Sequence, residues 1–358
     1  KALADGACGV SLGLGYAPEI FYSTDGLIRA LAPLYQSGVP ICVHMRQEGD
    51  GVVAALREMI EVARALQTPL EVSHLKAIGG RNARKAVPEM LSLIARAREE
   101  GLDVMCDAYP YTAGSTQLIH VLPPEFQAGG TETLTKRLRD RAAREEMRAR
   151  METGSDFENI TLLVGFENVV GIGLRTDEYR RFEGKSIAEI ALALGKDPYD
   201  ALFDLLSAEK CEAGMIDYIS DEEDLKAILR APFSGVISDA TYPGTGQVHP
   251  RVYGAFARLI ETYVVRENVL TLEQAVHKVT QQAAERFSFA GKGKIEVGAD
   301  ADLLLFAPEK IRERGTYLAP KACASGFDEV FVLGERVIEN GEYRGGSSGE
   351  MLGLRMEY

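Results

Sequence analysis

Short apolar runs alternate with amphipathic stretches along the first third of the chain. Four runs have the length of buried strands, at 8–14, 39–45, 69–75 and 102–108. The stretches 24–37, 51–66 and 83–100 carry apolar residues at helical spacing, so they predict helices between the strands. Such alternation predicts a parallel sheet with right-handed crossovers, and it fits either a closed barrel or an open sheet.

The pattern changes in the middle, and we expect an insertion at about 120–232. Residues 133–151 predict one long, charged surface helix, and 160–174 predict one or two strands. Ser220–Glu223 predicts a capping box at the start of a helix. An insertion between barrel strands typically forms a lid or a wall beside the site.

The remainder returns to regular elements. Residues 234–239 predict a buried strand that ends in an acid, and 253–266 and 271–286 predict helices. Apolar runs and glycine turns predict paired strands within 293–306 and within 328–343. We therefore expect three parts, at 1–288, at 289–345 (a small β-domain) and at 346–358 (a flexible tail).

The amino-acid composition limits which classes of protein the chain can belong to. Hydrophobic residues make up 46% of the 358 positions and charged residues 26%, which is typical of a globular protein. A net charge of −13 argues against nucleic-acid or anionic-membrane partners. Five scattered cysteines without a CxxC pair favour a reducing cytoplasm. The first residues carry no initiator Met and no signal peptide, so we expect the chain to begin inside a domain.

Two histidines occupy matching places in successive strand–helix units. His44 and His74 each lie near the carboxyl end of a predicted strand, and that end forms the catalytic mouth of α/β barrels. Two imidazoles aimed at one mouth suit a divalent transition metal such as zinc. Asp239 ends a third strand, where a carboxylate ligates metal or accepts a proton. A single such histidine is more often structural, but the matching set favours a site.

Other polar residues follow the same strand ends. Lys76 and Arg251 suit a substrate carboxylate, which arginine binds with two parallel hydrogen bonds. Tyr109 and Ser115 suit hydrogen bonding to the carbonyl that is attacked. The structural alternative for each is a solvated loop lysine or an aromatic packing residue.

The chain resembles the D-aminoacylase (N-acyl-D-amino-acid deacylase) group of the amidohydrolase superfamily over nearly its whole length. The matching motifs are the glycine-rich run 9–18, His44-Met45-Arg46, Ser73-His74-Leu75-Lys76, DAYPYTAGST at 107–116, Ser238-Asp239 with His249-Pro250-Arg251, and GADADL at 298–303. The family's first-strand His-x-His and its bridging cysteine have no counterpart here. The resemblance thus implies that the first barrel strands precede this chain.

The resemblance implies an α/β fold, namely part of a TIM-type (β/α)8 barrel followed by a small β-sandwich domain. It implies one tight zinc site at His44 and His74, a second metal site involving Asp239, and Asp239 as the catalytic acid and base. Lys76, Tyr109, Ser115 and Arg251 are implied to bind the substrate. The implied reaction is hydrolysis of N-acyl-D-amino acids to a carboxylate and a D-amino acid.

Three alternatives remain at this point. A cyclic-amide hydrolase of the dihydroorotase or hydantoinase kind would carry a carboxylated lysine in the run 8–14, which has none. A barrel that only binds a ligand would contain no zinc. An incomplete enzyme would be inactive without its missing strands.

Overall fold

A parallel sheet forms the centre of the computed structural model, which describes residues 1–241 and 246–352. The strand order is β1-β2-β3-β4-β8, and each neighbouring pair is parallel. Its strands are β1 (Val10–Gly13), β2 (Ile41–His44), β3 (Leu70–Val72), β4 (Val104–Ala108) and β8 (Ser234–Val236). The expected alternation of strands and helices is confirmed for 8–108, with parallel pairing throughout.

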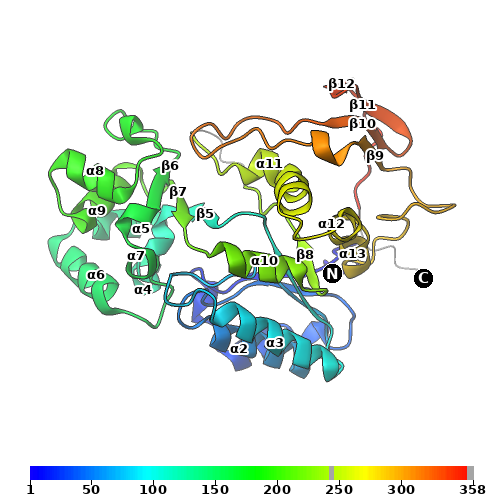
Figure 1. Ribbon diagram of the computed structural model, residues 1–358. Coiled ribbons are helices and arrows are strands. Elements are labelled where there is room, and N and C mark those ends of the chain that lie inside the picture. The colour runs from blue at the N-terminus through cyan, green and yellow to red at the C-terminus, as the bar shows by residue number, and fades with distance from the viewer. Residues whose placement is uncertain (242–245, 353–358) are drawn as a thin grey trace.

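Amphipathic helices cover this sheet (Figure 1). They include α1 (Thr24–Ala30), α2 (Val52–Leu66), α3 (Ala86–Glu99) and α10 (Glu222–Arg230), with the short 3-10 helices η1 (Glu19–Phe21) and η2 (Ala32–Leu34). In α2, Leu56, Met59 and Ala63 share one buried stripe, and burial of each large side chain contributes about 2 kcal/mol. The helix ends where Gln67 adopts a left-handed conformation, with φ 47°.

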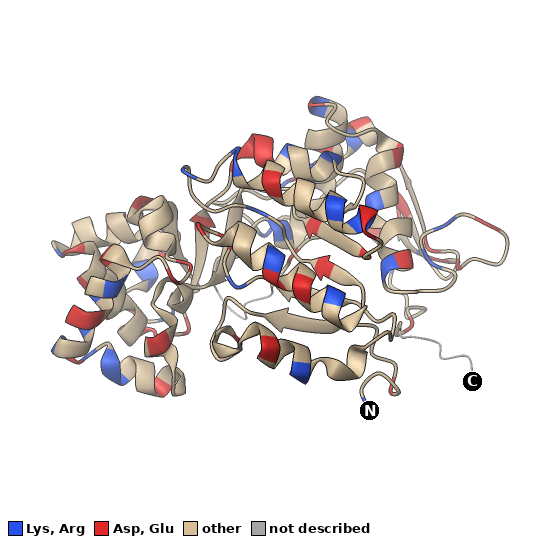
Figure 2. Cartoon of the chain, turned by 90° about the horizontal axis from the view of Figure 1, so that it is seen from below, with Lys and Arg blue, Asp and Glu red and all other residues tan. Residues whose placement is uncertain are grey.

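A second, antiparallel sheet forms in the middle of the chain. Its strands are β5 (Ala113–Gln117), β7 (Gly214–Tyr218) and β6 (Val169–Ile172), in the order β5-β7-β6. The helices of this region are η3 (Leu118–Val121), α4 (Pro124–Gln127), α5 (Gly130–Arg137), α6 (Arg141–Thr153), α7 (Ile160–Val164), η4 (Phe166–Asn168), η5 (Arg180–Phe182), α8 (Ile187–Leu194) and α9 (Pro198–Ala208). These elements enclose their own hydrophobic core and form a separate lobe (Figures 1 and 2).

Several local predictions for residues 120–232 differ from the structure. The single helix expected at 133–151 is two helices, because Asp140 caps α6 by accepting a hydrogen bond from Ala143 N. Of the one or two strands expected at 160–174, one forms, β6, and the start of that range is helix α7, which Asn159 caps. The helix α10 is capped by Asp221, so the capping box expected at Ser220 does not form. The strands β5 and β7 were not predicted.

The segment after β8 returns to the main sheet. It comprises α11 (Arg251–Arg258), a π-helical turn η6 (Leu259–Arg266), α12 (Leu272–Val279) and α13 (Gln281–Arg286). Thr280, with φ −130° and ψ −90°, breaks the helix that was expected to continue over 271–286.

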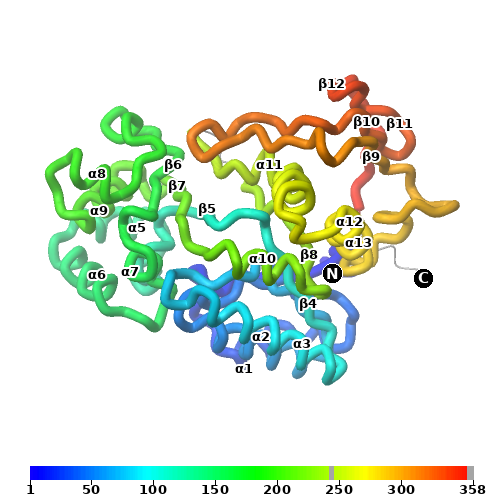
Figure 3. The backbone as a smooth tube through the Cα atoms, in the orientation of Figure 1, coloured from blue at the N-terminus to red at the C-terminus, as the bar shows by residue number. Residues whose placement is uncertain are grey.

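A four-stranded antiparallel sheet follows near the C-terminus, as Figures 1 and 3 show. It contains β9 (Leu303–Phe306), β10 (Phe327–Val332), β11 (Glu335–Glu339) and β12 (Glu342–Tyr343), with η7 (Pro308–Lys310) in the connection. Within 293–306 only β9 is a strand, so the pair predicted there was wrong. Residues 353–358 of the predicted tail lie outside the described residues, and the domain boundaries remain a prediction.

In the described part of the chain, no helix has both the length and the apolar character needed to cross a membrane.

Candidate metal centre

The two histidines meet at the carboxyl ends of neighbouring strands. His44 is the last residue of β2, and His74 lies two residues beyond β3. The backbone of His74 adopts a left-handed conformation with φ 40°, and its N–H donates to Asp107 Oδ1 at 2.5 Å. Nδ1 of His44 then lies 3.2 Å from Nε2 of His74. The structure thus brings together two side chains that are 30 residues apart.

These two nitrogens fit a shared metal ion. Zinc–nitrogen bonds of about 2.0–2.1 Å at a tetrahedral angle place two ligand nitrogens about 3.3 Å apart. Burial lowers the pKa of His44 to about 3, so its imidazole is neutral and offers a lone pair. Tyr16 stacks on the His44 ring with centroids 4.4 Å apart, which fixes the plane of that ring. Spacing and protonation both suit a divalent ion.

A carboxylate that the sequence reasoning missed adjoins the pair. Glu48 is 2% exposed, and its Oε1 lies 3.0 Å from Nδ1 of His74 and 2.7 Å from Nζ of Lys76. Burial opposes ionisation of Glu48, but the positive charge of Lys76 and the hydrogen bond with His74 outweigh it and hold its pKa below the usual range. His44, Glu48 and His74 form a group able to hold a metal. The one feature of the sequence that points to Glu48 is its position as an acid four residues after His44.

Asp239 lies in the same region but in a different contact. It follows β8 by three residues, and its Oδ2 lies 2.7 Å from Nη1 of Arg251. Among the described residues, the close group of candidate ligand atoms consists of His44, Glu48 and His74, without Asp239. The assignment of Asp239 to a metal or to proton transfer therefore remains a proposal.

Arg251 connects several of the expected substrate residues. Its side chain is buried, its Nη2 donates to the carbonyl of Ser115 at 3.0 Å, and its guanidinium lies 4.7 Å from the ring centroid of Tyr109. Lys76 Nζ lies 5.7 Å from the same centroid. The hydroxyl of Ser115 donates instead to the carbonyl of Met215 at 2.8 Å, within the inserted sheet. The two cations therefore both lie near the Tyr109 ring.

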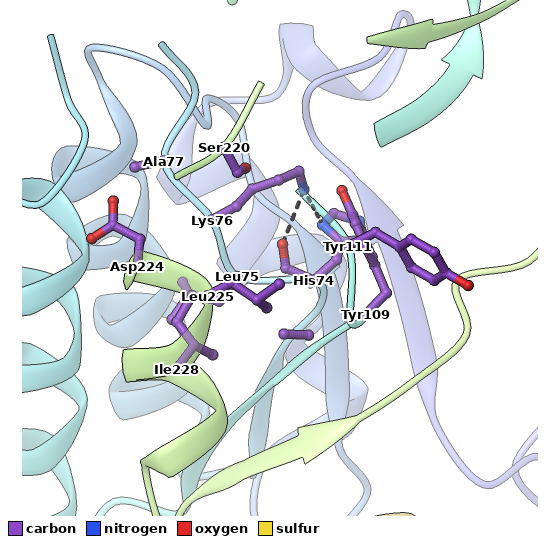
Figure 4. A pocket seen from close by; sticks show the side chains of 11 residues that line it. His74, Leu75, Lys76, Ala77, Tyr109, Tyr111, Ser220, Asp224, Leu225 and Ile228 are labelled. Atoms are coloured by element: carbon purple, nitrogen blue, oxygen red, sulfur yellow. Dashed lines mark hydrogen bonds between the residues drawn. The ribbon is translucent and has the colours of Figure 1, made fainter. Parts of the chain in front are cut away.

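A small cavity adjoins this cluster, lined by residues that include His74, Lys76, Tyr109, Tyr111 and Ser220. Figure 4 shows the Lys76 amine directed at His74, with hydrogen bonds to its carbonyl at 2.9 Å and to its Nδ1 at 2.8 Å. Four of these residues belong to loops that follow the main strands, and Ser220 follows the inserted sheet. The site thus joins the parallel sheet to the inserted lobe.

Comparison with known proteins identifies the family of this chain. A family model described as the amidohydrolase family matches residues 67–321. The chain belongs to the amidohydrolase family. This result confirms the resemblance seen in the sequence.

Among curated relatives, this amidohydrolase is 30% identical to a D-aminoacylase of Alcaligenes xylosoxydans xylosoxydans over 355 residues, which cover 98% of the chain and 62% of the relative. It is 32% identical to an N-acyl-D-glutamate deacylase of the same organism, covering 93% of the chain and 58% of the relative. The chain therefore spans about three-fifths of the length of these relatives.

Solved structures agree. A crystal structure of D-aminoacylase matches 99% of the chain and 64% of that protein, with TM-score 0.78 and 30% identity. An N-acyl-D-glutamate deacylase from Bordetella bronchiseptica, complexed with zinc and a phosphonate mimic of the tetrahedral intermediate, matches with TM-score 0.79 and 29% identity, over 99% of this chain and 64% of that one. A dihydropyrimidinase from Brevibacillus agri, at 14% identity and TM-score 0.53 over 96% of this chain and 66% of that one, shares the fold alone. The α/β architecture expected from the sequence is confirmed.

Proposed function

We propose that this protein hydrolyses the amide bond of N-acyl-D-amino acids, with zinc at His44 and His74, and releases a carboxylate and a D-amino acid. The observation that carries the proposal is the 3.2 Å approach of two imidazole nitrogens beside two buried cations, Lys76 and Arg251. The similarity to D-aminoacylase and to N-acyl-D-glutamate deacylase supports the substrate class.

The two cations suit the α-carboxylate, which every N-acyl-D-amino acid carries. A guanidinium and an ammonium near the Tyr109 ring present several donors to the α-carboxylate of the amino acid. Burial raises the pKa of Tyr109 to about 12, so its hydroxyl stays protonated and can donate to the scissile carbonyl. Ser115 can join this contact if its hydroxyl turns away from Met215.

In this proposal, Asp239 transfers the proton. The ion pair with Arg251 holds its carboxylate at the mouth of the sheet, where it takes a proton from the attacking water and returns it to the leaving amine. A zinc ion at the two imidazoles supplies Lewis-acid activation of water and carbonyl. A second metal beside Asp239 belongs to the same proposal, and one similar structure concerns a D-aminoacylase with a binuclear metal centre.

The setting of the enzyme is part of the proposal. We place it in the cytoplasm, which the scattered cysteines support, with a small-molecule substrate and no nucleic-acid or membrane partner. The net charge of −13 supports the last point, because it disfavours polyanionic partners.

A panel of N-acetyl-D- and N-acetyl-L-amino acids tests the proposal in the full natural polypeptide that carries this chain. We expect amine release from D-substrates, its loss with a chelator and its return with zinc. Asp239→Asn should lower kcat at least 100-fold while the zinc at His44 and His74 stays bound, since general acid–base catalysis contributes about 10²–10⁴-fold. If the zinc-loaded protein cleaves no D-substrate, the proposed function is refuted. If the D239N variant is active, Asp239 does not have the proposed role.

A further inference from the structure

A buried carboxylate outside the groups discussed so far lies on the inserted sheet. Asp217 is the next-to-last residue of β7, lies opposite Gly114 of β5, and is 3% exposed. Its Oδ1 is buried without a hydrogen-bond partner among the described residues. A Cβ on Gly114 would lie only 2.8 Å from that oxygen, so the glycine leaves room for the carboxylate over the β5 backbone.

This part of β5 also borders the candidate site. The carbonyls on either side of Gly114 accept hydrogen bonds from the site: Ala113 O from His249 Nε2 and Ser115 O from Arg251 Nη2, each at 3.0 Å. Burial raises the pKa of Asp217, but the nearby charges of Lys76 and Arg251 limit the rise to about 6. The carboxylate is therefore mainly ionised at neutral pH, and it lies within electrostatic range of both cations.

The charged side chains around the site disfavour the binding of a further anion. In the part of the chain that the structure describes, the buried cations beside the two imidazoles are Lys76 and Arg251. The acids of the same region are Glu48, Asp217 and Asp239. Burial raises the pKa of Glu158 to about 8, so this further acid adds little negative charge at neutral pH. Glu158 comes from the inserted lobe, and its Oε2 accepts a hydrogen bond from Glu48 N at 2.7 Å. Residues 240–248, which join Asp239 to His249, contain no lysine or arginine.

We propose that Asp217 is a specificity-determining residue, which selects N-acyl-D-amino acids with neutral or basic side chains and disfavours acidic ones. The inference rests on the proposed function, in which Lys76 and Arg251 already hold the α-carboxylate. A second carboxylate on the substrate would meet the unpaired oxygen of Asp217 without a cation in the described part of the site to offset it. An amide or ammonium side chain would instead give that oxygen a donor.

N-acetyl-D-glutamine and N-acetyl-D-glutamate form the matched pair for the test, since they differ in charge and hardly in shape. The zinc-loaded full natural polypeptide should cleave the glutamine derivative with at least a 10-fold higher kcat/KM. Asp217→Asn should reduce this ratio at least 10-fold. The control Asp177→Asn makes the same change in net charge on the same lobe, where the Asp177 side chain is 100% exposed, and should leave the ratio within twofold.

The outcomes separate this inference from the proposed function. Equal or better cleavage of N-acetyl-D-glutamate by the wild-type protein would overturn the inference and leave the function standing. An unchanged ratio in a D217N variant with a wild-type melting curve would remove Asp217 from the role, and Asp217→Ser serves as the second variant. The wild-type ratio needs no variant, so it decides even if both substitutions unfold the protein. Cleavage of no N-acetyl-D-amino acid at all would refute the proposed function itself.

Discussion

Glu48 touches the ring nitrogen of His74 that faces away from His44. Its Oε1 lies at Nδ1, while Nε2 of His74 faces His44. A carboxylate at the second nitrogen of a metal-binding imidazole favours the tautomer that keeps the first nitrogen free for the metal. The Lys76 amine lies 2.8 Å from the same Nδ1 and, as a donor to it, would favour the opposite tautomer. The charge of Glu48 therefore decides between the two, and we interpret Glu48 as a positioning residue.

Glu48→Gln tests that interpretation. The amide keeps the shape of the side chain but loses the negative charge, so zinc affinity should fall about 10–100-fold, the range typical of such outer contacts. Competition with a chromogenic chelator measures the dissociation constant without any substrate. Glu61→Gln, on the exposed side of α2, is the matched control and should keep wild-type affinity. An E48Q variant that binds zinc as tightly as the wild type would leave Glu48 without this role.

At the scale of elements, the loop after β1 limits where His44 can lie. A Cβ on Gly15 would lie 2.5 Å from Nε2 of His44 and 3.0 Å from its Cδ2. The bare backbone of this turn, together with the stacked ring of Tyr16, therefore helps to hold the imidazole at the end of β2.

Gly15→Ala should displace the His44 ring and lower zinc affinity at least 10-fold, because ligand geometry is sensitive to shifts of about half an ångström. Gly80→Ala is the control, since a Cβ there meets nothing within 4 Å. Isothermal titration with zinc distinguishes the two variants. Equal affinity in both would show that the loop can give way and that Gly15 does not fix the ring.

Elements with a strong periodic pattern were predictable from the sequence, and those held by distant contacts were not. Helix α2 and strands β2 to β4 follow their apolar patterns closely. Strand β5, with the sequence AGSTQ, has no apolar alternation and exists because it pairs with β7 about 100 residues later. The break at Asp140 was missed because good helix formers surround a single capping residue.

For the whole molecule, the site is assembled from segments far apart in the chain. Arg251 reaches the Ser115 carbonyl across 136 positions, and the backbone N–H of Glu48 donates to the Glu158 carboxylate across 110. Strand-end positions led to His44 and His74 because parallel strands deliver their carboxyl ends to one edge. The ion pair of Asp239 with Arg251 and the buried charge of Asp217 depend on how the inserted lobe packs, which no local pattern encodes.

Zinc-edge anomalous diffraction from crystals of the zinc-loaded natural protein tests the central claim most directly. We predict a peak bonded to Nδ1 of His44 and Nε2 of His74 at about 2.0–2.1 Å, with Glu48 on the far nitrogen of His74. A peak bonded to neither imidazole, or no peak in crystals soaked with zinc, would contradict the account.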